Sequence, residues 1–195
     1  MIRRPPRSTL DRSSAASDVY KRQIQESEKV LDINNAVVGE EGDKESSYRK
    51  SKTGFIHYNN PDHNELWNVV SSKLWNVVND ANRTNFGFDI SYLDSVQYTV
   101  YHDGGDHYDW HIDTFLDTPN AFHRKLSVTV QLTNSNEYTG GDFKLRDGTG
   151  QELPEHVKDK GSVLIFPSFL LHKVTPVTSG TRRTLVAWFE GKRFK

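Results

Sequence analysis

Residues 96–113 read VQYTVYHDGGDHYDWHID and hold the pattern that decides the fold. β-Branched and aromatic residues fill positions 96–101 and predict a strand, whereas the paired glycines and aspartates at 103–106 predict a turn. Residues 108–113 have strand character again. Side chains two positions apart on a strand point to the same face, so we expect His111 and Asp113 to project together from one strand.

A second stretch, residues 161–188, reads GSVLIFPSFLLHKVTPVTSGTRRTLVAW. It predicts an apolar strand, a break at a proline, a strand that ends near His172, a Pro/Gly turn and a last strand that carries Arg182. The two imidazoles and one carboxylate of His111, Asp113 and His172 would form the facial triad of non-heme Fe(II) oxygenases. That triad leaves coordination positions open for a cosubstrate and O2.

Together these segments resemble the Fe(II)/2-oxoglutarate dioxygenase superfamily, in its prolyl-4-hydroxylase-like branch. Members of that branch share a Tyr and a Gly ahead of the His-x-Asp pair, a Gly-x-x-x-x-Phe-Pro segment before the second His, and a basic residue ten positions after it. The resemblance extends over residues 47–191, with an Arg-led strand at 124–127 and a Gly-Gly turn at 138–141. The matching motif positions are Tyr108, Gly105, His111, Asp113, Gly161, Phe166, Pro167, His172 and Arg182.

The resemblance implies a mainly β (α+β) fold, a double-stranded β-helix or jelly roll with one or two supporting helices from the N-terminal third. The short strands and turns that follow Asp94 independently predict a sandwich or barrel. Asn60 and Pro61 predict the start of a helix, because Asn is a good cap and Pro is favoured at the first helical position. We expect this helix to run to about Ala81 and to pack its tryptophans, Trp67 and Trp75, against the sheet.

The family likeness also implies the roles of the site residues. His111, Asp113 and His172 would bind Fe(II), and Arg182 would bind the distal carboxylate of 2-oxoglutarate. The planar guanidinium matches a carboxylate with two parallel hydrogen bonds, which Lys cannot reproduce. Successive strand residues face opposite sides, so we expect the neighbouring Arg183 to form a surface ion pair.

The sequence does not decide which other residues contact 2-oxoglutarate. Thr184 shares the predicted face of Arg182 and is expected to add a hydroxyl contact. Relatives often place a cosubstrate-binding tyrosine on the strand at 127–131, where this chain has none. Tyr101, Thr129 and Gln131 are the candidates to replace it. Two further expectations are that Trp110 points away from the ligands into the core, and that residues 102–107 form a solvent-facing turn.

The implied reaction is hydroxylation of a C–H bond, coupled to conversion of 2-oxoglutarate and O2 to succinate and CO2, with ascorbate as a supporting cofactor. A prolyl residue in a peptide or protein is the expected substrate. The alternatives are a free amino acid, a small molecule or an alkylated base. A further alternative from another class is a cupin-like module that holds a metal without turnover, and such a module has no need of a buried guanidinium at the position of Arg182.

Composition adds limits to these expectations. The 195 residues fit one domain, with no transmembrane run and no cysteine. We therefore expect no association with a membrane, no disulfide or thiolate metal site, and a cytoplasmic location.

Residues 1–23 differ in composition from the rest of the chain. They hold six basic and two acidic residues, without periodicity and without the apolar core of a signal peptide. This stretch is similar to translated adapter sequence, and we expect it to be non-native or disordered. The dioxygenase domain would then occupy residues 24–195, with its catalytic core at about 94–191. That domain carries a net charge of −5, against −1 for the whole chain, which argues against a nucleic acid substrate.

Overall fold

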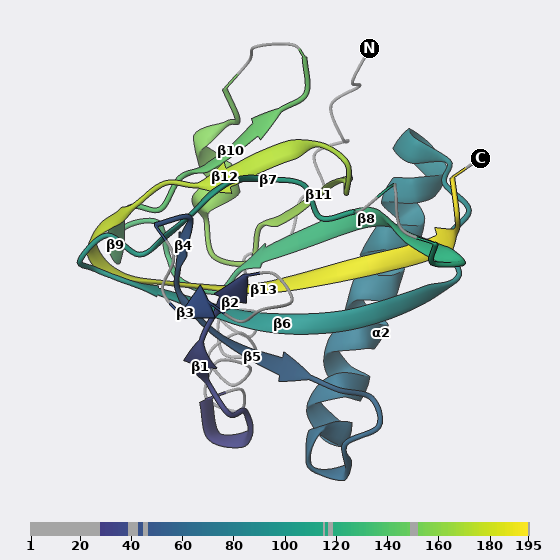
Figure 1. Cartoon of the computed structure of the whole chain (residues 1–195), viewed down its shortest axis with the longest axis horizontal. Helices are drawn as coiled ribbons and strands as arrows, with labels where there is room; N and C mark the ends of the chain where they lie inside the picture. The colour runs from purple at the N-terminus through teal and green to yellow at the C-terminus, as the bar shows by residue number, and fades with distance from the viewer. Residues whose placement is uncertain are drawn as a thin grey trace.

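Two larger antiparallel sheets and one long helix dominate the described part of the chain (Figure 1). The computed structural model describes residues 28–38, 43–44, 47–114, 116, 119–148 and 152–194. The expectation for residues 1–23 lies outside these residues. No helix among the described residues is long and apolar enough to span a membrane.

The larger sheet has seven strands and contains most of the strand pairs of the fold. Its order is β1-β5-β6-β13-β8-β11, and β9 pairs with β13 beside this path. The long strands β6, β13 and β8 lie at its centre, so the C-terminal strand is bonded on both sides. The strands of this sheet are β1 (Asn34–Asn35), β5 (Lys52–Ile56), β6 (Tyr92–His102), β8 (Phe122–Gln131), β9 (Tyr138–Gly140), β11 (Val163–Pro167) and β13 (Val177–Lys192).

The smaller sheet is four-stranded, in the order β10-β12-β7-β4. It contains both predicted imidazole ligands, because β7 and β12 pair with each other. A separate hairpin joins β2 and β3. The strands are β4 (Arg49–Lys50), β7 (His107–His111), β10 (Phe143–Arg146) and β12 (Leu171–Val174), and the hairpin strands are β2 (Val37–Val38) and β3 (Asp43–Lys44).

Helix α2 (Asn64–Ala81) lies across the outer face of the larger sheet (Figure 1). Its buried residues recur every fourth position, as an amphipathic helix requires, and they join the main hydrophobic core. These residues are Leu66, Val70, Leu74 and Val78. The shorter helical turns are η1 (Pro61–His63) before α2, the π-helical η2 (Asn82–Phe86) after it, and η3 (Glu155–Lys158).

The predicted helix is confirmed, but its first turn is the 3-10 turn η1, and the α-helix begins at Asn64. The Asn60 side chain accepts a hydrogen bond from the backbone N–H of Asp62, and Pro61 opens η1, which leads into α2. Helix α2 ends at Ala81. Both tryptophans pack against the core, and Trp75 meets the ring of Phe189 edge-on at 4.8 Å. The mainly β fold with a supporting helix is therefore as the sequence predicted.

The packing of α2 on the sheet makes a measurable contribution to stability. Leu74 is 4% exposed in the main core, whereas Val77 on the same helix is 41% exposed. We expect Leu74→Ala to lower the free energy of unfolding by about 2–5 kcal/mol, because it removes buried apolar surface and leaves a cavity. Val77→Ala should change it by less than about 0.5 kcal/mol. Urea denaturation of both variants measures the difference, and equal midpoints would contradict the packing described.

Candidate metal and cosubstrate site

The two imidazoles lie opposite each other in the smaller sheet. His111 at the end of β7 is the register partner of His172 on β12. Each ring places its Nδ1 against the backbone carbonyl two residues earlier, at 2.7 Å from Asp109 O and at 2.9 Å from Leu170 O. A carbonyl oxygen only accepts, so Nδ1 carries the proton in both rings. Both Nε2 lone pairs are thereby left for a metal ion, in the orientation that such backbone contacts fix in metal sites.

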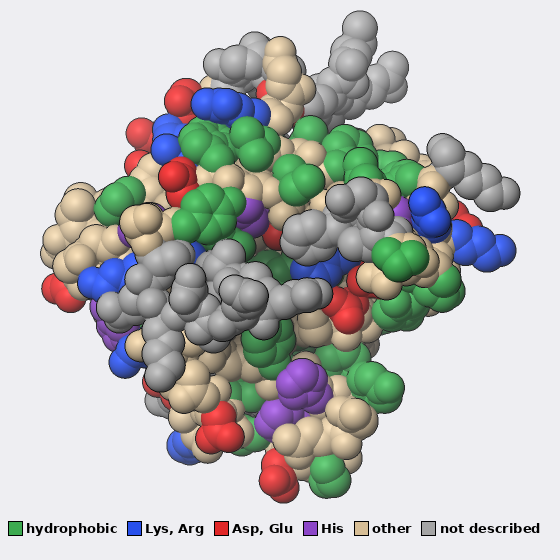
Figure 2. Space-filling view, viewed as in Figure 1, with side chains coloured by type: hydrophobic (Ala, Val, Ile, Leu, Met, Phe, Trp, Pro, Cys, Tyr) green, Lys and Arg blue, Asp and Glu red, His purple; other side chains and the backbone are tan. Residues whose placement is uncertain are grey.

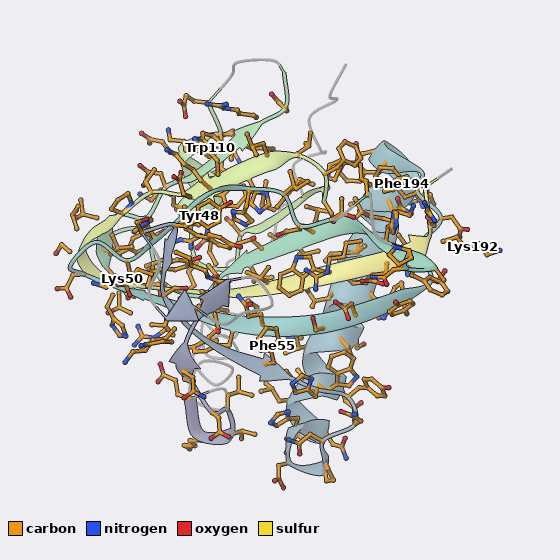
Figure 3. The ribbon with its side chains drawn as sticks, in the orientation of Figure 1. Tyr48, Lys50, Phe55, Trp110, Lys192 and Phe194 are labelled. Carbon is orange, nitrogen blue, oxygen red and sulfur yellow. The ribbon has the colours of Figure 1, made fainter. Side chains whose placement is uncertain are left out.

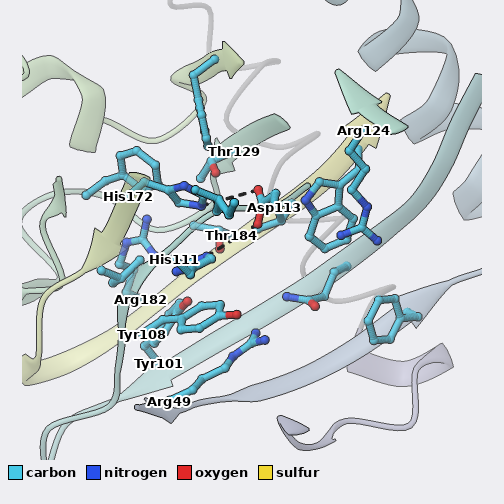
Figure 4. A pocket seen from close by; sticks show the side chains of 18 residues that line it. Arg49, Tyr101, Tyr108, His111, Asp113, Arg124, Thr129, His172, Arg182 and Thr184 are labelled. Atoms are coloured by element: carbon cyan, nitrogen blue, oxygen red, sulfur yellow. Dashed lines mark ion pairs between the residues drawn. The ribbon is translucent and has the colours of Figure 1, made fainter. Parts of the chain in front are cut away.

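Asp113 completes the set from just beyond β7. Its Oδ1 lies 3.6 Å from His111 Nε2 and its Oδ2 lies 3.5 Å from His172 Nε2, as the dashed lines in Figure 4 show. One potential ligand atom from each residue lies within 4.8 Å of the others. Two imidazoles and a carboxylate in this arrangement suit Fe(II).

Two serines hold the carboxylate in place. Ser127 Oγ on β8 donates to Asp113 Oδ2 at 2.6 Å and lies 2.9 Å from Ser168 Oγ. The backbone N–H of Asp113 donates to Ser168 O at 2.9 Å. Asp113 is therefore fixed through both its backbone and its side chain, by residues that the sequence analysis did not single out.

A β-bulge in β7 shapes the wall of the site. Between two register pairs, β7 runs from Tyr108 to His111 while β12 runs only from Val174 to His172, so β7 contains one extra residue. Simple alternation would put Tyr108 and His111 on opposite faces. The bulge instead lets both rings face the cavity, where they stack at 3.5 Å between centroids.

The expectation that Trp110 packs in the core is wrong in one respect. Trp110 points away from the ligands as predicted, but it is only half-buried, on the outer face of the smaller sheet (Figure 3). Its ring contacts two cations there, Arg146 at 4.4 Å and Lys173 at 4.9 Å. The smaller sheet has no covering helix among the described elements, so its outer residues meet solvent.

Arg49 on β4 extends the ring stack into a column. Its guanidinium lies 4.3 Å from the centroid of the Tyr108 ring, which also stacks on His111. Burial raises the pKa of Tyr108 to about 12, so its ring is a neutral phenol. The column restricts rotation of the His111 ring and so keeps Nε2 aimed at the site.

Loss of the ring at position 108 should therefore weaken metal binding. We expect Tyr108→Leu to lower the affinity for Fe(II) about tenfold, the usual cost of losing a group that orients a metal ligand. Tyr108→Phe keeps the ring and should retain the affinity. Anaerobic titration calorimetry measures both, and equal affinities for the two variants would show that the stack does not orient the ligand.

The protonation of His111 is set by its surroundings. Burial and the neighbouring His172 lower the pKa of His111 from 6.5 to about 4, against the opposing effect of Asp113. The imidazole is therefore neutral at pH 7 and can bind a metal without first losing a proton.

The same shift predicts a pH dependence of stability. Between pH 6.5 and 4 the unfolded chain binds a proton at His111 that the folded chain does not. The metal-free protein should therefore lose stability as the pH falls through this window. His111→Gln should flatten that part of the profile. Urea midpoints of both proteins between pH 7 and 4 provide the measurement, and identical slopes would contradict the shifted pKa.

The site opens into a cavity of about 210 Å³ between the two sheets (Figure 4). Arg182 on β13 lines it and is only 1% exposed. Its Nε and Nη2 atoms, and the Oγ1 atom of Thr184, have no hydrogen-bond partner among the described residues. Burying unpaired donors costs free energy. These unpaired donors are positioned to stabilise an anion in the cavity.

Alternation along β13 separates the two arginines as expected. Arg183 points to the opposite face, where its Nε donates to Glu28 at 2.9 Å. On the cavity side, Gly141 makes room for Arg182, because a Cβ at position 141 would lie 2.9 Å from Arg182 Cδ. The Gly-Gly turn therefore has a function in the site beyond reversing the chain.

The remaining cosubstrate candidates lie at different distances from the cavity. Tyr101, Thr129 and Thr184 line it, and the Tyr101 ring lies 5.4 Å from the guanidinium of Arg182. Gln131 is buried beside Thr184 in register but is not among the lining residues. The structure thus places three of the four candidates in the cavity lining together with Arg182, whereas Gln131 is not part of that lining.

The other half of the cavity has a different character. Arg124 lies over the Trp188 ring at 4.1 Å and forms an ion pair with Asp94 at 2.9 Å. Ile112 and Phe55, both partly exposed, mark the opening. The cavity therefore has a closed end at Arg182 and an open end at these residues.

Comparison with known proteins agrees with this geometry. Residues 96–190 match the model of the 2OG-Fe(II) oxygenase superfamily. A PKHD-type hydroxylase of Alteromonas mediterranea is 38% identical over 87 residues, which are 43% of this chain and 38% of that protein. A PKHD-type hydroxylase of Gloeothece citriformis is 31% identical over 125 residues, 62% of this chain and 56% of the relative. The chain thus spans about half, or less, of the length of these relatives.

Solved structures share the fold. A prolyl hydroxylase from Trichoplax adhaerens, in complex with a peptide fragment of the hypoxia inducible factor oxygen degradation domain, has a TM-score of 0.67 at 19% identity, over 91% of this chain and 79% of that one. A prolyl-4-hydroxylase of Pseudomonas putida has a TM-score of 0.59 at 18% identity, over 93% and 85%.

The fold and the arrangement of His111, Asp113 and His172 are typical of non-heme oxygenases of the jelly-roll type. Over residues 96–190 the chain is similar to the 2OG-Fe(II) oxygenase superfamily, and its fold is similar to that of prolyl 4-hydroxylases. That superfamily implies Fe(II), 2-oxoglutarate and O2.

Proposed function

We propose that the protein is an Fe(II)- and 2-oxoglutarate-dependent dioxygenase that hydroxylates a prolyl residue in a peptide or protein. The observation that carries this proposal is the buried guanidinium of Arg182, two of whose nitrogen atoms have no partner among the described residues, in the same cavity as His111, Asp113 and His172. A module that only stores a metal gains nothing from such a group, which costs free energy when its pocket is empty.

The metal-binding residues and the cavity residues would have different roles in this reaction. His111, Asp113 and His172 would hold Fe(II), and the bound iron supplies the chemistry that couples reduction of O2 to decarboxylation of the cosubstrate. Arg182 would pair with the distal carboxylate of 2-oxoglutarate through two charged hydrogen bonds. Thr184 would add its unpaired hydroxyl.

The closed end of the cavity also excludes water from the cosubstrate. Tyr101 lies beside Arg182, and both side chains are almost fully buried. Exclusion of water strengthens the charged contacts and protects the oxidant from side reactions. The open end, between Trp188 and Phe55, is left for the substrate.

The hydroxylase names of the relatives, and the peptide complex among the structural neighbours, support a peptidyl substrate. At the open end, Arg124 stacks on the ring of Trp188, and this ring adds an apolar surface to the cavity. A flat aromatic surface suits a proline ring, which has no polar group of its own.

Succinate formation tests the reaction class. Incubation with Fe(II), ascorbate, 2-oxoglutarate and a proline-rich peptide library should release succinate and give hydroxylated peptides in mass spectrometry. Release of succinate without any hydroxylated proline would support the dioxygenase assignment but contradict the prolyl substrate. The substrate would then be a free amino acid, a small molecule or an alkylated base. Metal binding without any succinate would favour the cupin-like module instead.

A further inference from the structure

The loop between β11 and β12 contacts two of the three candidate metal ligands through its backbone. Ser168 O accepts a hydrogen bond from the backbone N–H of Asp113 at 2.9 Å. Two residues later, Leu170 O accepts from His172 Nδ1 at 2.9 Å. The position of this loop therefore sets the orientation of both ligands.

Phe169 lies between these two contacts in the chain, and its ring packs on two other phenylalanines. It meets Phe194 edge-on at 6.1 Å and Phe88 edge-on at 6.3 Å, while Phe88 and Phe194 meet each other at 6.2 Å. We call these three residues the phenylalanine triangle. Its members come from the loop before β12, the segment before β6 and the segment after β13. Edge-on aromatic pairs are favourable beyond their apolar contact, so the triangle ties the loop to both segments.

A second contact links Phe194 to the same loop. Lys125 on β8 is only 4% exposed and places its Nζ 3.1 Å from the centroid of the Phe194 ring. A cation over an aromatic face is attracted to it, more strongly where water is excluded. The backbone O of Lys125 accepts a hydrogen bond from the N–H of Ser168 at 3.0 Å. Phe194 thus contacts both Phe169 and the residue that holds Ser168.

The triangle lies close to the surface. Phe169 is 40% exposed. Figure 3 labels Phe194 near the upper end of α2, and hydrophobic side chains gather in that part of the same view in Figure 2. Loss of the Phe169 ring should cost the fold less than loss of a fully buried ring, so its effect on the metal site can be measured separately.

We propose that the phenylalanine triangle positions the metal ligands, and that Phe169 and Phe194 are positioning residues for Asp113 and His172. The triangle restricts movement of the loop, and the loop contains the carbonyl oxygens that orient the two ligands. Neither ring is among the residues that line the cavity, so both act through the loop. The inference rests on the proposed function in one respect, which is that His111, Asp113 and His172 bind a divalent metal ion.

Binding of Co(II) tests the triangle without turnover. A site of nitrogen and oxygen ligands binds Co(II) at least as tightly as Fe(II), and the visible absorption of bound Co(II) reports the geometry of its ligands. Groups that orient metal ligands usually contribute about 10–100-fold in affinity. Phe169→Ala and Phe194→Ala should therefore each weaken Co(II) binding about tenfold or more and change the spectrum of the bound ion. Phe194→Tyr keeps the ring and should retain both the affinity and the spectrum.

Phe86→Ala is the matched control. Phe86 stacks on Phe88 at 6.3 Å and packs against the main core, but it is not part of the triangle. This variant should lower the urea midpoint and leave the Co(II) affinity and spectrum unchanged. An unchanged affinity in Phe169→Ala would overturn the proposal. Equal losses of affinity in Phe86→Ala and Phe169→Ala would also overturn it, because they would indicate a general loosening of the fold.

The two proposals fail in different ways. Co(II) binding that Asp113→Ala does not weaken would refute the metal site and this inference together. Co(II) binding that depends on Asp113 but not on Phe169 or Phe194 would uphold the metal site and refute the triangle alone. Weakened Co(II) binding in the triangle variants, without succinate formation by the unmodified protein, would uphold the triangle and refute the dioxygenase.

Discussion

Asp113→Ala is expected to abolish turnover and to weaken Fe(II) binding by more than about a hundredfold, while the protein stays folded. Asp113 is the only anionic residue of the three that approach each other in the site. Loss of a group that merely orients a ligand costs about 10–100-fold in metal affinity, and loss of the ligand itself should exceed that. Metal titration and succinate assays measure the two effects, and circular dichroism reports on the fold.

Two further variants sharpen this test. Asp113→Asn can still accept the hydrogen bond from Ser127 but lacks the charge, so it should lose metal binding as well. Asp109→Ala is the matched control, because this exposed carboxylate lies outside the cavity lining and accepts a hydrogen bond from the neighbouring Trp110 backbone. Full hydroxylation by Asp113→Ala would refute the assignment of the metal site.

Arg182→Lys is expected to raise the KM for 2-oxoglutarate about tenfold or more. A charged hydrogen bond contributes about 1.5–3 kcal/mol, and tenfold requires only about 1.4 kcal/mol. Lys cannot reach the carboxylate with two parallel donors from the buried position of Arg182. The Fe(II) affinity should hardly change, because Arg182 is not one of the metal-binding side chains.

The neighbouring arginine provides the control for charge. Arg183→Lys should leave the KM for 2-oxoglutarate unchanged, since Arg183 faces away and pairs with Glu28. The 2-oxoglutarate dependence of succinate formation compares the two variants directly. A raised KM in Arg183→Lys alone would show that 2-oxoglutarate does not bind at Arg182. An unchanged KM in both variants would favour the alternative of a cupin-like module that binds a metal without turnover.

Local periodicity was enough to predict several parts of this structure. The alternation of strand side chains placed Arg182 and Thr184 on one face and Arg183 on the other, as the cavity shows. The cap at Asn60 predicted the helix that ends at Ala81. The facing of strand side chains and the cap of a helix depend on residues that are close in sequence. A local sequence pattern is therefore enough to predict them.

Long-range pairing lay beyond the reach of such patterns. Arg49 reaches Tyr108 only because β4 pairs with β7, some sixty residues later. The bulge in β7 is visible only against its partner strand, and without it Tyr108 would face outward. Ser127 likewise meets Asp113 across two sheets. Each of these contacts depends on strand register, which no local pattern in a single sequence specifies.

Binding of the cosubstrate at Arg182 would also be linked to folding. A guanidinium that is 1% exposed, with two nitrogen atoms unpaired among the described residues, makes the folded chain less stable than it would be with an anion in place. By mass action, a ligand that binds only the folded state adds about 2.7 kcal/mol at a hundred times its Kd. The melting temperature of this protein is therefore expected to follow the 2-oxoglutarate concentration around it. A cell rich in this metabolite would hold more of the folded enzyme than one depleted of it.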